Sequence, residues 1–330
     1  MTVKRTVNVP CNLTDQRTET KFSDFTCFSF TDLRFLNQND PKTIVGQAGK
    51  VLDINCTSVT RKFITTLNLE VNGSVKAIGD NHSVNYSFTP YRTDHLTKYI
   101  CVDSKQSWIM IEVTLFIRYS PVIEGRLTNE TITCDRNGVP AMYSVNRLDH
   151  ESEDGKLVRS VNLNNETFTL NTEQFPYQKN GRYTCAVSNG IPDSNGNVLQ
   201  TWSTNVKFEG LPVFAPENRN VKIGEVGQSI TLSFYLYSYP KVEQIFVEKI
   251  GLNSIKSNKI QQYTLSKSTL RYTEFNNNNN AGIEGYKILI ESGILDAADF
   301  QTYRITAKNQ LGNTDYYFEI IDNGRYEDYK

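Results

Sequence analysis

A short motif around a tyrosine recurs three times along the chain and constrains the fold more than any other feature. The most complete copy covers residues 183–190 and reads Tyr-Thr-Cys-Ala-Val-Ser-Asn-Gly. A second copy covers residues 303–309, with Ile305 in the place of the cysteine, and is followed by Gly312. The remaining copy, at residues 99–101, keeps Tyr-Ile-Cys without the tail. Because a repeated unit indicates tandem copies of one domain, we expect several similar domains in series.

An upstream motif accompanies each tyrosine motif and tests the repeat independently. Leu52, Ile54 and Cys56 alternate with polar residues, as burial of every second residue of a strand demands. Cys134 occupies the corresponding position before the second tyrosine motif, and Phe234 occupies it before the third. Each repeat therefore supplies one core position upstream and one downstream.

With both motifs in register, residues 40–322 resemble the immunoglobulin superfamily, closest to its I-set type. The resemblance implies an all-β chain of three tandem immunoglobulin-like sandwiches. In this family the upstream motif is strand B, and the downstream motif is strand F, whose tyrosine turns its hydroxyl back to the backbone. The resemblance therefore implies tyrosine corners at Tyr99, Tyr183 and Tyr303.

The resemblance also implies how the cysteines pair. The pairs are Cys56 with Cys101 and Cys134 with Cys185 from the frame of strands B and F, and Cys11 with Cys27 only by elimination. In the third copy Phe234 and Ile305 stand where the family has cysteines, so we expect them to replace the disulfide by apolar contact. Disulfides form in oxidising compartments, which favours an extracellular protein.

The chain departs from the family on strand C, where a buried tryptophan usually packs against the disulfide. Its two tryptophans, Trp108 and Trp202, both follow strand F instead. We take Val145 and Phe246 as the residues that replace the tryptophan in the second and third copies.

Length and composition agree with this organisation. A chain of 330 residues is long enough for two or three domains of about 100 residues. Its strand-like runs are rich in Val, Ile, Thr, Tyr and Phe and are separated by Asn, Gly, Pro and Asp. The formal net charge is −1 and the basic residues are scattered, which excludes the electrostatic footprint of a nucleic-acid-binding protein.

The repeat frame divides the chain into five segments. They are an N-terminal segment 1–40 with the extra disulfide, domain 1 at 41–119, domain 2 at 120–209, domain 3 at 213–322 without the disulfide between strands B and F, and a polar tail 323–330. The junctions are short, at 120–121 and 210–212, and short junctions favour a semi-rigid rod.

Seven N-x-S/T sequons point to a secreted glycoprotein, although such triplets also arise by chance in an Asn-rich chain. They begin at Asn12, Asn55, Asn72, Asn81, Asn85, Asn129 and Asn165. All lie before residue 166, so we expect glycans on the first two domains and bare protein on the third.

The sequence offers little for catalysis. His82, His95 and His150 are dispersed, and no spacing of His, Asp, Cys or Glu matches a metal, cofactor or nucleophile motif. The acidic run 149–154 is either a cation-dependent contact loop or a solvated turn, and we favour the turn. Tyrosines 235, 237 and 239 alternate along a strand, which leaves a core role and an interface role equally open.

We therefore expect a non-enzymatic, extracellular module that binds a protein or glycan ligand on another cell or in body fluid. The resemblance implies cell adhesion or receptor-type recognition, with homophilic contact included. One alternative is a soluble invertebrate-type immune-recognition protein with a lectin or fibrinogen-like module beyond Lys330; another is the ligand-binding ectodomain of a receptor enzyme. Residues 1–30 lack a signal-type apolar stretch and no later run approaches about 18 apolar residues, so we expect a mature or truncated ectodomain without a membrane segment.

Overall fold

The computed structural model describes residues 33–39, 42–59, 64–170, 174–250, 262–273, 275 and 281–323. The predicted Cys11–Cys27 pair and the Asn12 sequon lie outside these residues. By contact density the chain divides into two compact units. One comprises the described residues of 1–121, 137–143 and 189–198, and the other those of 122–136, 144–188 and 199–330. The fold is all-β, as predicted, and the described residues include three short 3-10 turns among the strands.

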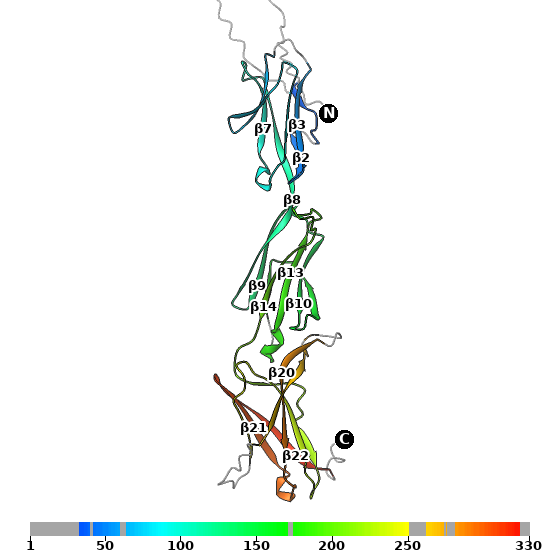
Figure 1. Cartoon of the computed structure of the whole chain (residues 1–330), viewed down its shortest axis with the longest axis vertical. Coiled ribbons are helices and arrows are strands. Elements are labelled where there is room, and N and C mark those ends of the chain that lie inside the picture. Colours follow the sequence, from blue (N-terminus) through cyan, green and yellow to red (C-terminus); the bar gives the residue numbers. More distant parts are fainter. Residues whose placement is uncertain are drawn as a thin grey trace, which may run out of the picture. The chain divides into compact units, whose positions relative to one another are not determined.

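The first sandwich consists of two sheets (Figure 1). One has the order β1 (Leu33–Phe35), β3 (Leu52–Ser58), β6 (Ser83–Phe88); the other has the order β5 (Ser74–Ile78), β4 (Leu67–Val71), β7 (Lys98–Asp103), β8 (Met110–Thr128), with β2 (Thr43–Gln47) parallel to β8. Strand β1 lies inside the segment 1–40, so part of that predicted segment belongs to this sandwich.

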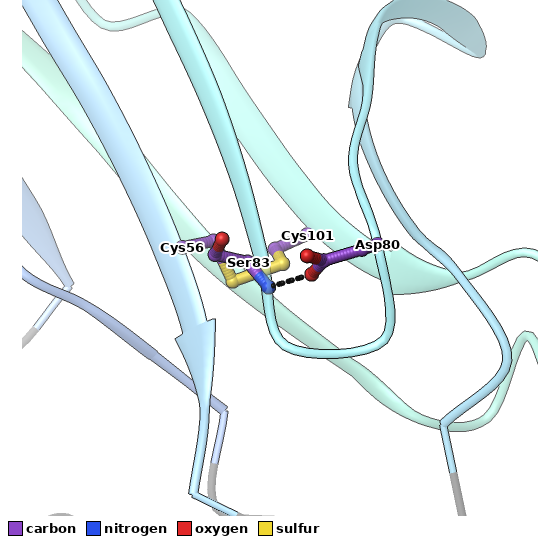
Figure 2. The surroundings of a disulfide bond; sticks show 4 residues. All are labelled: Cys56, Asp80, Ser83 and Cys101. Atoms are coloured by element: carbon purple, nitrogen blue, oxygen red, sulfur yellow. Dashed lines mark hydrogen bonds between the residues drawn. A yellow bond between two sulfur atoms is a disulfide. The ribbon is translucent and has the colours of Figure 1, made fainter. Parts of the chain in front are cut away.

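The disulfide Cys56–Cys101 links β3 to β7 across the first sandwich, with the two Cα atoms 6.4 Å apart. Figure 2 shows it beside the turn that leads into β6. There the backbone N–H of Ser83 donates to Oδ1 of Asp80 at 2.7 Å, which closes the turn. Both cysteines are fully buried, so the covalent bond lies at the centre of the apolar core.

The second sandwich also has two sheets, and it shares one strand with the first. Its larger sheet has the order β11 (Leu157–Asn162), β10 (Val145–Glu151), β13 (Gly181–Ser188), β14 (Gln200–Val206); the other contains β12 (Thr167–Thr169), β9 (Thr131–Val139) and β8. The disulfide Cys134–Cys185 links β9 to β13, with Cα atoms 6.3 Å apart. Strand β8 is hydrogen-bonded to both β7 and β9, so the predicted boundary at 119–120 falls inside a continuous strand.

The third sandwich has two four-stranded sheets. One has the order β15 (Val213–Phe214), β17 (Thr231–Tyr237), β20 (Gly282–Glu291), β19 (Thr264–Arg271); the other has the order β16 (Val221–Gly224), β22 (Gly312–Asp322), β21 (Thr302–Asn309), β18 (Gln244–Lys249). Strand β16 runs parallel to β22 as β2 runs parallel to β8, so the edge of the first sandwich recurs here.

The residues predicted to replace the tryptophan on strand C were wrong, because this strand pairs with strand F in a different register from the expected one. The residues directly opposite the strand F core positions are Leu69 opposite Cys101, Leu148 opposite Cys185 and Val247 opposite Ile305. All three apolar residues on strand C are buried, whereas the predicted Val145 and Phe246 are only half-buried. Phe246 alternates with the buried Ile245 and Val247, so its side chain points away from the core. An aliphatic side chain therefore takes the tryptophan's position in each sandwich.

Aromatic packing fills the core of the third sandwich, which has no disulfide between β17 and β21. Phe234 and Ile305 are both fully buried in one apolar cluster. The ring centroid of Phe234 lies 5.0 Å from that of Phe318, and the ring of Tyr303 stacks on Phe318 at 5.4 Å. Rings from three strands thus occupy this core, and direct contact between Phe234 and Ile305 stays a prediction.

Two of the three tyrosines at the start of strand F make the corner hydrogen bond. The hydroxyl of Tyr183 donates to the carbonyl of Lys179 at 3.0 Å, and the hydroxyl of Tyr303 donates to that of Asp299 at 3.0 Å. Burial raises the pKa of Tyr183 to about 12. Tyr99 is also buried, but its hydroxyl makes no hydrogen bond within the described residues. As far as the described residues show, the first sandwich therefore keeps the buried ring of the corner without the hydrogen bond from its hydroxyl.

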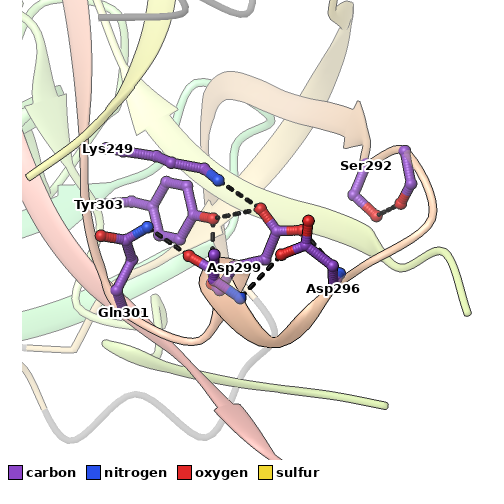
Figure 3. Close-up of polar contacts among 8 residues, drawn as sticks. Lys249, Ser292, Asp296, Asp299, Gln301 and Tyr303 are labelled. Carbon is purple, nitrogen blue, oxygen red and sulfur yellow. Dashed lines mark hydrogen bonds and ion pairs between the residues drawn. The ribbon is translucent and has the colours of Figure 1, made fainter. Parts of the chain in front are cut away.

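The corner of the third sandwich is built on a short 3-10 turn, η3 (Ala297–Asp299), which Figure 3 shows. Asp296 caps this turn by accepting a hydrogen bond from the N–H of Ala298 at 2.7 Å. The ammonium group of Lys249 lies 2.5 Å from Oδ1 of Asp299. Partial burial raises the pKa of this carboxyl, but the contact with Lys249 and further hydrogen bonds outweigh burial, so the pKa is lowered. The turn and the corner therefore support each other.

An asparagine at the end of strand F recurs in the second and third sandwiches with the same role: Asn189 directly follows β13, and Asn309 is the last residue of β21. The amide nitrogen of Asn189 donates to the carbonyl of Tyr119 at 2.9 Å. The amide nitrogen of Asn309 donates to the carbonyl of Gly210 at 2.8 Å. Tyr119 lies where the chain enters the second sandwich, and Gly210 lies where it enters the third. In each sandwich the asparagine of the repeated motif is therefore hydrogen-bonded to the segment that leads into that sandwich.

The second and third sandwiches meet in an aromatic cluster inside the second unit. The ring of Tyr177, before β13, stacks on that of Tyr237, in β17, at 5.1 Å between centroids. The amide nitrogen of Gln178 donates to the carbonyl of Arg271 at 2.9 Å beside it. Tyr237, the last residue of β17, is buried in this contact, whereas Tyr239 lies beyond the end of the strand and is exposed.

Candidate functional site

The described residues hold no group of three or more His, Cys, Asp or Glu side chains that could bind a metal ion. None of the helices in the described part of the chain is long and apolar enough to span a membrane.

The acidic run 149–154 is held by polar neighbours of its own strand pair. Asp149 accepts hydrogen bonds from Arg147 at 3.0 Å and from Ser160 at 2.6 Å. Asp154 is hydrogen-bonded to Ser152 and lies 2.9 Å from the ammonium group of Lys156. The two carboxylates point to separate cationic partners, which speaks against a cation-binding loop. The favoured interpretation as a solvated turn holds only for part of the run, because residues 149–151 end strand β10 and the turn begins at Ser152, which is buried like His150.

His150 lies in the second sandwich against the aromatic cluster. Its ring stacks on Tyr183 at 4.2 Å between centroids, and Tyr272 and Phe275 contact it edge-on at 5.5 and 5.8 Å. Burial lowers its pKa from 6.5 to about 4, the nearby Arg159 lowers it further, and a hydrogen bond with the carbonyl of Asn180 opposes the shift. A neutral, enclosed ring of this kind serves packing.

The outer face of the sheet β5-β4-β7-β8 in the first sandwich carries an apolar row. Met110 lies opposite Val102, Val102 opposite Asn68, and Asn68 opposite Ile78. These positions alternate with core residues such as Cys101, so their side chains point away from the interior. Ile78 is 72% exposed and Met110 is 56% exposed. Ile78 in β5 and Met110 in β8 therefore expose aliphatic side chains to water, whereas between them Val102 is buried and Asn68 is polar and half-buried.

The next row across the same sheet mixes apolar and charged residues. Glu112 lies opposite Ile100, Ile100 opposite Glu70, and Glu70 opposite Val75. Glu112 also pairs with the ammonium group of Lys98 at 3.0 Å. We call the five residues Val75, Ile78, Ile100, Val102 and Met110 the apolar face. Trp108 lies in the loop before β8 and is 67% exposed.

The opposite sheet of the same sandwich, β1-β3-β6, presents a different surface. Its outward residues, which alternate with core residues, are Arg34, Asp53, Asn55, Thr57, Ser83, Asn85 and Ser87. All are polar, and all are exposed or half-buried. Scattered exposed apolar residues are normal on a protein, but Val75, Ile78 and Met110 are exposed on one sheet and the outward positions of the other sheet hold none, and this contrast favours an interaction surface.

Sequence reasoning had a signal for the apolar face and did not use it. In the run 99–102, Tyr-Ile-Cys-Val, apolar residues occupy consecutive positions, so both faces of the strand are apolar. The signal is weak alone, because a strand covered on both sides has the same pattern. Only the alignment of four strands shows that the outward positions form one surface.

The asparagines of the described sequons lie at positions outside the apolar face. Asn55 and Asn85 lie on the outer face of β1-β3-β6, Asn81 lies in the bend before β6, and Asn72 lies in the turn between β4 and β5. The remaining two described sequons begin at Asn129, between β8 and β9, and Asn165, before β12. No described sequon has its asparagine on the outward positions of β5, β4, β7 or β8. Their glycosylation stays a prediction.

Comparison with known proteins gave structural matches only. No family profile and no curated protein sequence matches the chain. Among solved structures, the complex of Dpr2 Ig1–Ig2 with DIP-Theta Ig1–Ig3 superposes with a TM-score of 0.52 at 16% identity, over 88% of this chain and 99% of that one. The fragment I67–I69 of titin gives a TM-score of 0.42 at 13% identity, over 88% and 98% of the two chains. The ectodomain Ig1–Ig3 of mouse nectin-like molecule 4 gives 0.36 at 15% identity, over 86% and 98%.

Proposed function

Because the chain has the fold of tandem immunoglobulin-like domains, we propose that it is an extracellular, non-catalytic recognition module. Its binding site is the apolar face of the first sandwich, and its ligand is a protein. The observation that carries this proposal is the contrast between the apolar face and the wholly polar opposite sheet.

A protein surface fits the apolar face better than a glycan does. Exposed aliphatic side chains on a sheet gain free energy when a dry partner surface covers them, about 1.5–3 kcal/mol for each side chain fully buried. Charged residues lie among and beside them: Glu70 lies between Val75 and Ile100, and Glu112, beside Ile100, pairs with Lys98. Protein interfaces typically combine an apolar centre with a polar rim, so the partner presents a complementary apolar patch.

Cell adhesion or receptor-type recognition is the form of this function that we propose, with homophilic contact included. The matched complex of Dpr2 with DIP-Theta is itself a pairing of one immunoglobulin ectodomain with another, which makes a partner of similar fold a natural candidate. A soluble immune-recognition protein would use the same face. The length and anchoring of the complete protein would distinguish the two.

A glycan wedge tests the site. Glu70→Thr turns Asn68-Leu69-Glu70 into a sequon whose asparagine lies in the middle of the apolar row. The chain, produced in a glycosylating secretory host and tetramerised on labelled streptavidin, is applied to intact cells of its source and to beads coated with the same chain. We expect the unchanged chain to bind at least one of these surfaces. Protease treatment of the cells should abolish its binding to them. The wedge variant should bind neither surface. Normal binding by a verified glycosylated wedge variant contradicts the proposal.

A pair of matched substitutions provides the control for folding. Ile78→Asp places a charge on the apolar face, at a residue 72% exposed. Val51→Asp places the same charge before β3, away from that face, at a residue 73% exposed. We expect Ile78→Asp to weaken binding about tenfold or more, the equivalent of about 1.4 kcal/mol. Val51→Asp should bind as the unchanged chain does, and equal losses in both variants would sink the site.

A further inference from the structure

Two sequons of the first sandwich are direct neighbours in space. Asn55 in β3 lies opposite Asn85 in β6 in the antiparallel register, although 30 positions separate them in sequence. Both side chains point outward, because each alternates with buried residues such as Cys56 and Val84. Nothing in the sequence alone brings these two sequons together.

Their spacing leaves room for one glycan. Directly opposite residues of an antiparallel pair have Cβ atoms about 4.5–5.5 Å apart. An N-linked glycan is bulky from its first sugar ring, which is attached at the amide nitrogen of the asparagine. A ring on one asparagine therefore occupies the space above the other amide, and two glycans would compete for the same volume.

The surroundings favour Asn85 as the modified residue. Asn85 is exposed, whereas Asn55 is half-buried in the central strand of the three-stranded sheet. The outward neighbours of Asn85 along β6 are Ser83 and Ser87, both small. Asn55 instead lies between β1 and β6, with its backbone carbonyl accepting a hydrogen bond from the N–H of Leu36 at 2.9 Å.

We propose that Asn85 carries an N-linked glycan, and that Asn55 stays unmodified wherever Asn85 is occupied. This inference rests on the proposed extracellular function, because the modification needs the secretory pathway. The glycan covers the polar β1-β3-β6 face and closes it to protein partners. It thereby leaves the apolar face on the other sheet as the accessible broad surface of this sandwich.

Site occupancy tests the proposal directly. The full chain is secreted from a glycosylating cell line and deglycosylated enzymatically in heavy-oxygen water, which labels each formerly modified asparagine. Mass spectrometry then measures the label in the tryptic peptides 51–61 and 77–92, with fragmentation separating Asn81 from Asn85. We expect Asn85 to be almost fully labelled and Asn55 almost unlabelled. The proposal is overturned if the two fractions sum to more than one, or if Asn85 is unlabelled.

Variants that delete one sequon sharpen the test. Asn85→Gln and Ser87→Ala each remove the Asn85 sequon, and we expect Asn55 to gain label in both. Thr57→Ala removes the Asn55 sequon, and the label at Asn85 should stay unchanged. If Asn55 stays unlabelled in both secreted variants lacking the Asn85 sequon, competition between the sites is refuted.

The outcome is separable from that of the proposed function. Unmodified Asn85 in a chain whose wedge variant loses binding would reject only the glycan. Modified Asn85 in a chain whose apolar-face variants bind normally would reject only the binding site.

Discussion

The second and third sandwiches fill the same central position of the fold in two different ways. In the second, Cys134 and Cys185 form a disulfide inside a core cluster of eight buried residues. In the third, Phe234 and Ile305 take these positions inside a cluster of fifteen, and four aromatic rings are among them. A disulfide stabilises largely by restricting the unfolded chain, whereas apolar burial stabilises by removing surface from water. The repeat therefore keeps this position in the core, and the two sandwiches fill it with different residues that stabilise the fold by different mechanisms.

The largest effect in this comparison is expected from Phe234→Ala. The ring of Phe234 lies 5.0 Å from Phe318 and 6.1 Å from Tyr316, so its removal opens a cavity between the two sheets. We expect a loss of about 3–5 kcal/mol in the free energy of unfolding of the third sandwich. Urea denaturation, monitored by the hydrogen-exchange protection of β17 and β21, measures this loss.

Phe246→Ala is the matched control for that substitution, because the side chain of Phe246 is half-buried and points away from the core. Phe246→Ala should lower the free energy of unfolding clearly less than Phe234→Ala does. Equal losses for the two phenylalanines would show that the core of the third sandwich is not centred on Phe234.

Removal of the second sandwich's disulfide should cost nearly as much. The two cysteines are 51 residues apart in sequence, and cross-links that close loops of this length contribute about 2–5 kcal/mol. The double variant Cys134→Ala with Cys185→Ala should lose hydrogen-exchange protection in β9 and β13, as should the reduced protein. The strands β21 and β22 should keep most of theirs, and full protection of β13 after reduction would contradict the expectation.

Acid should weaken the second sandwich through His150, whereas the third contains no histidine. The pKa of His150 is about 4 in the folded protein, below its ordinary value of 6.5, because burial disfavours the charged ring. Between pH 6.5 and 4 the unfolded chain therefore binds more protons, so stability rises with pH over this range and is level above it. At about 1.4 kcal/mol per pH unit, the loss reaches about 3 kcal/mol at pH 4.

Denaturation midpoints measured across this pH range test the assignment. His150→Phe keeps a flat ring for the stack on Tyr183 and should remove the histidine's part of the slope. A slope that persists unchanged in this variant would have to come from other groups.

The smallest expected effects come from the tyrosine corners. Tyr183→Phe and Tyr303→Phe each remove a hydroxyl that donates to a backbone carbonyl at 3.0 Å, which should cost about 0.5–1.5 kcal/mol. Tyr99→Phe should cost less, because the described residues offer its hydroxyl no such partner. Thermal melts of the three variants rank them, and a loss for Tyr99→Phe equal to the other two would show that a hydrogen bond or water supports its hydroxyl.

The sequence by itself determined the strands and the repeat. Alternation in Leu52, Ile54 and Cys56, and the recurrence of a tyrosine before Cys101, Cys185 and Ile305, are local patterns, and local patterns determine which side of a strand is buried. The same frames placed the disulfides Cys56–Cys101 and Cys134–Cys185, which the structure contains.

Tertiary structure alone decided what depends on pairing between distant strands. The strand C core residues are Leu148 and Val247 instead of Val145 and Phe246, because the register of β10 and β18 is set by their partners and cannot be read from one strand. For the same reason the sequence could not bring Asn55 opposite Asn85, nor join Met110, Val102 and Ile78 into one face. Each of these surfaces is a property of the sheet, since its members come from different strands and meet only when the hydrogen-bond register is complete.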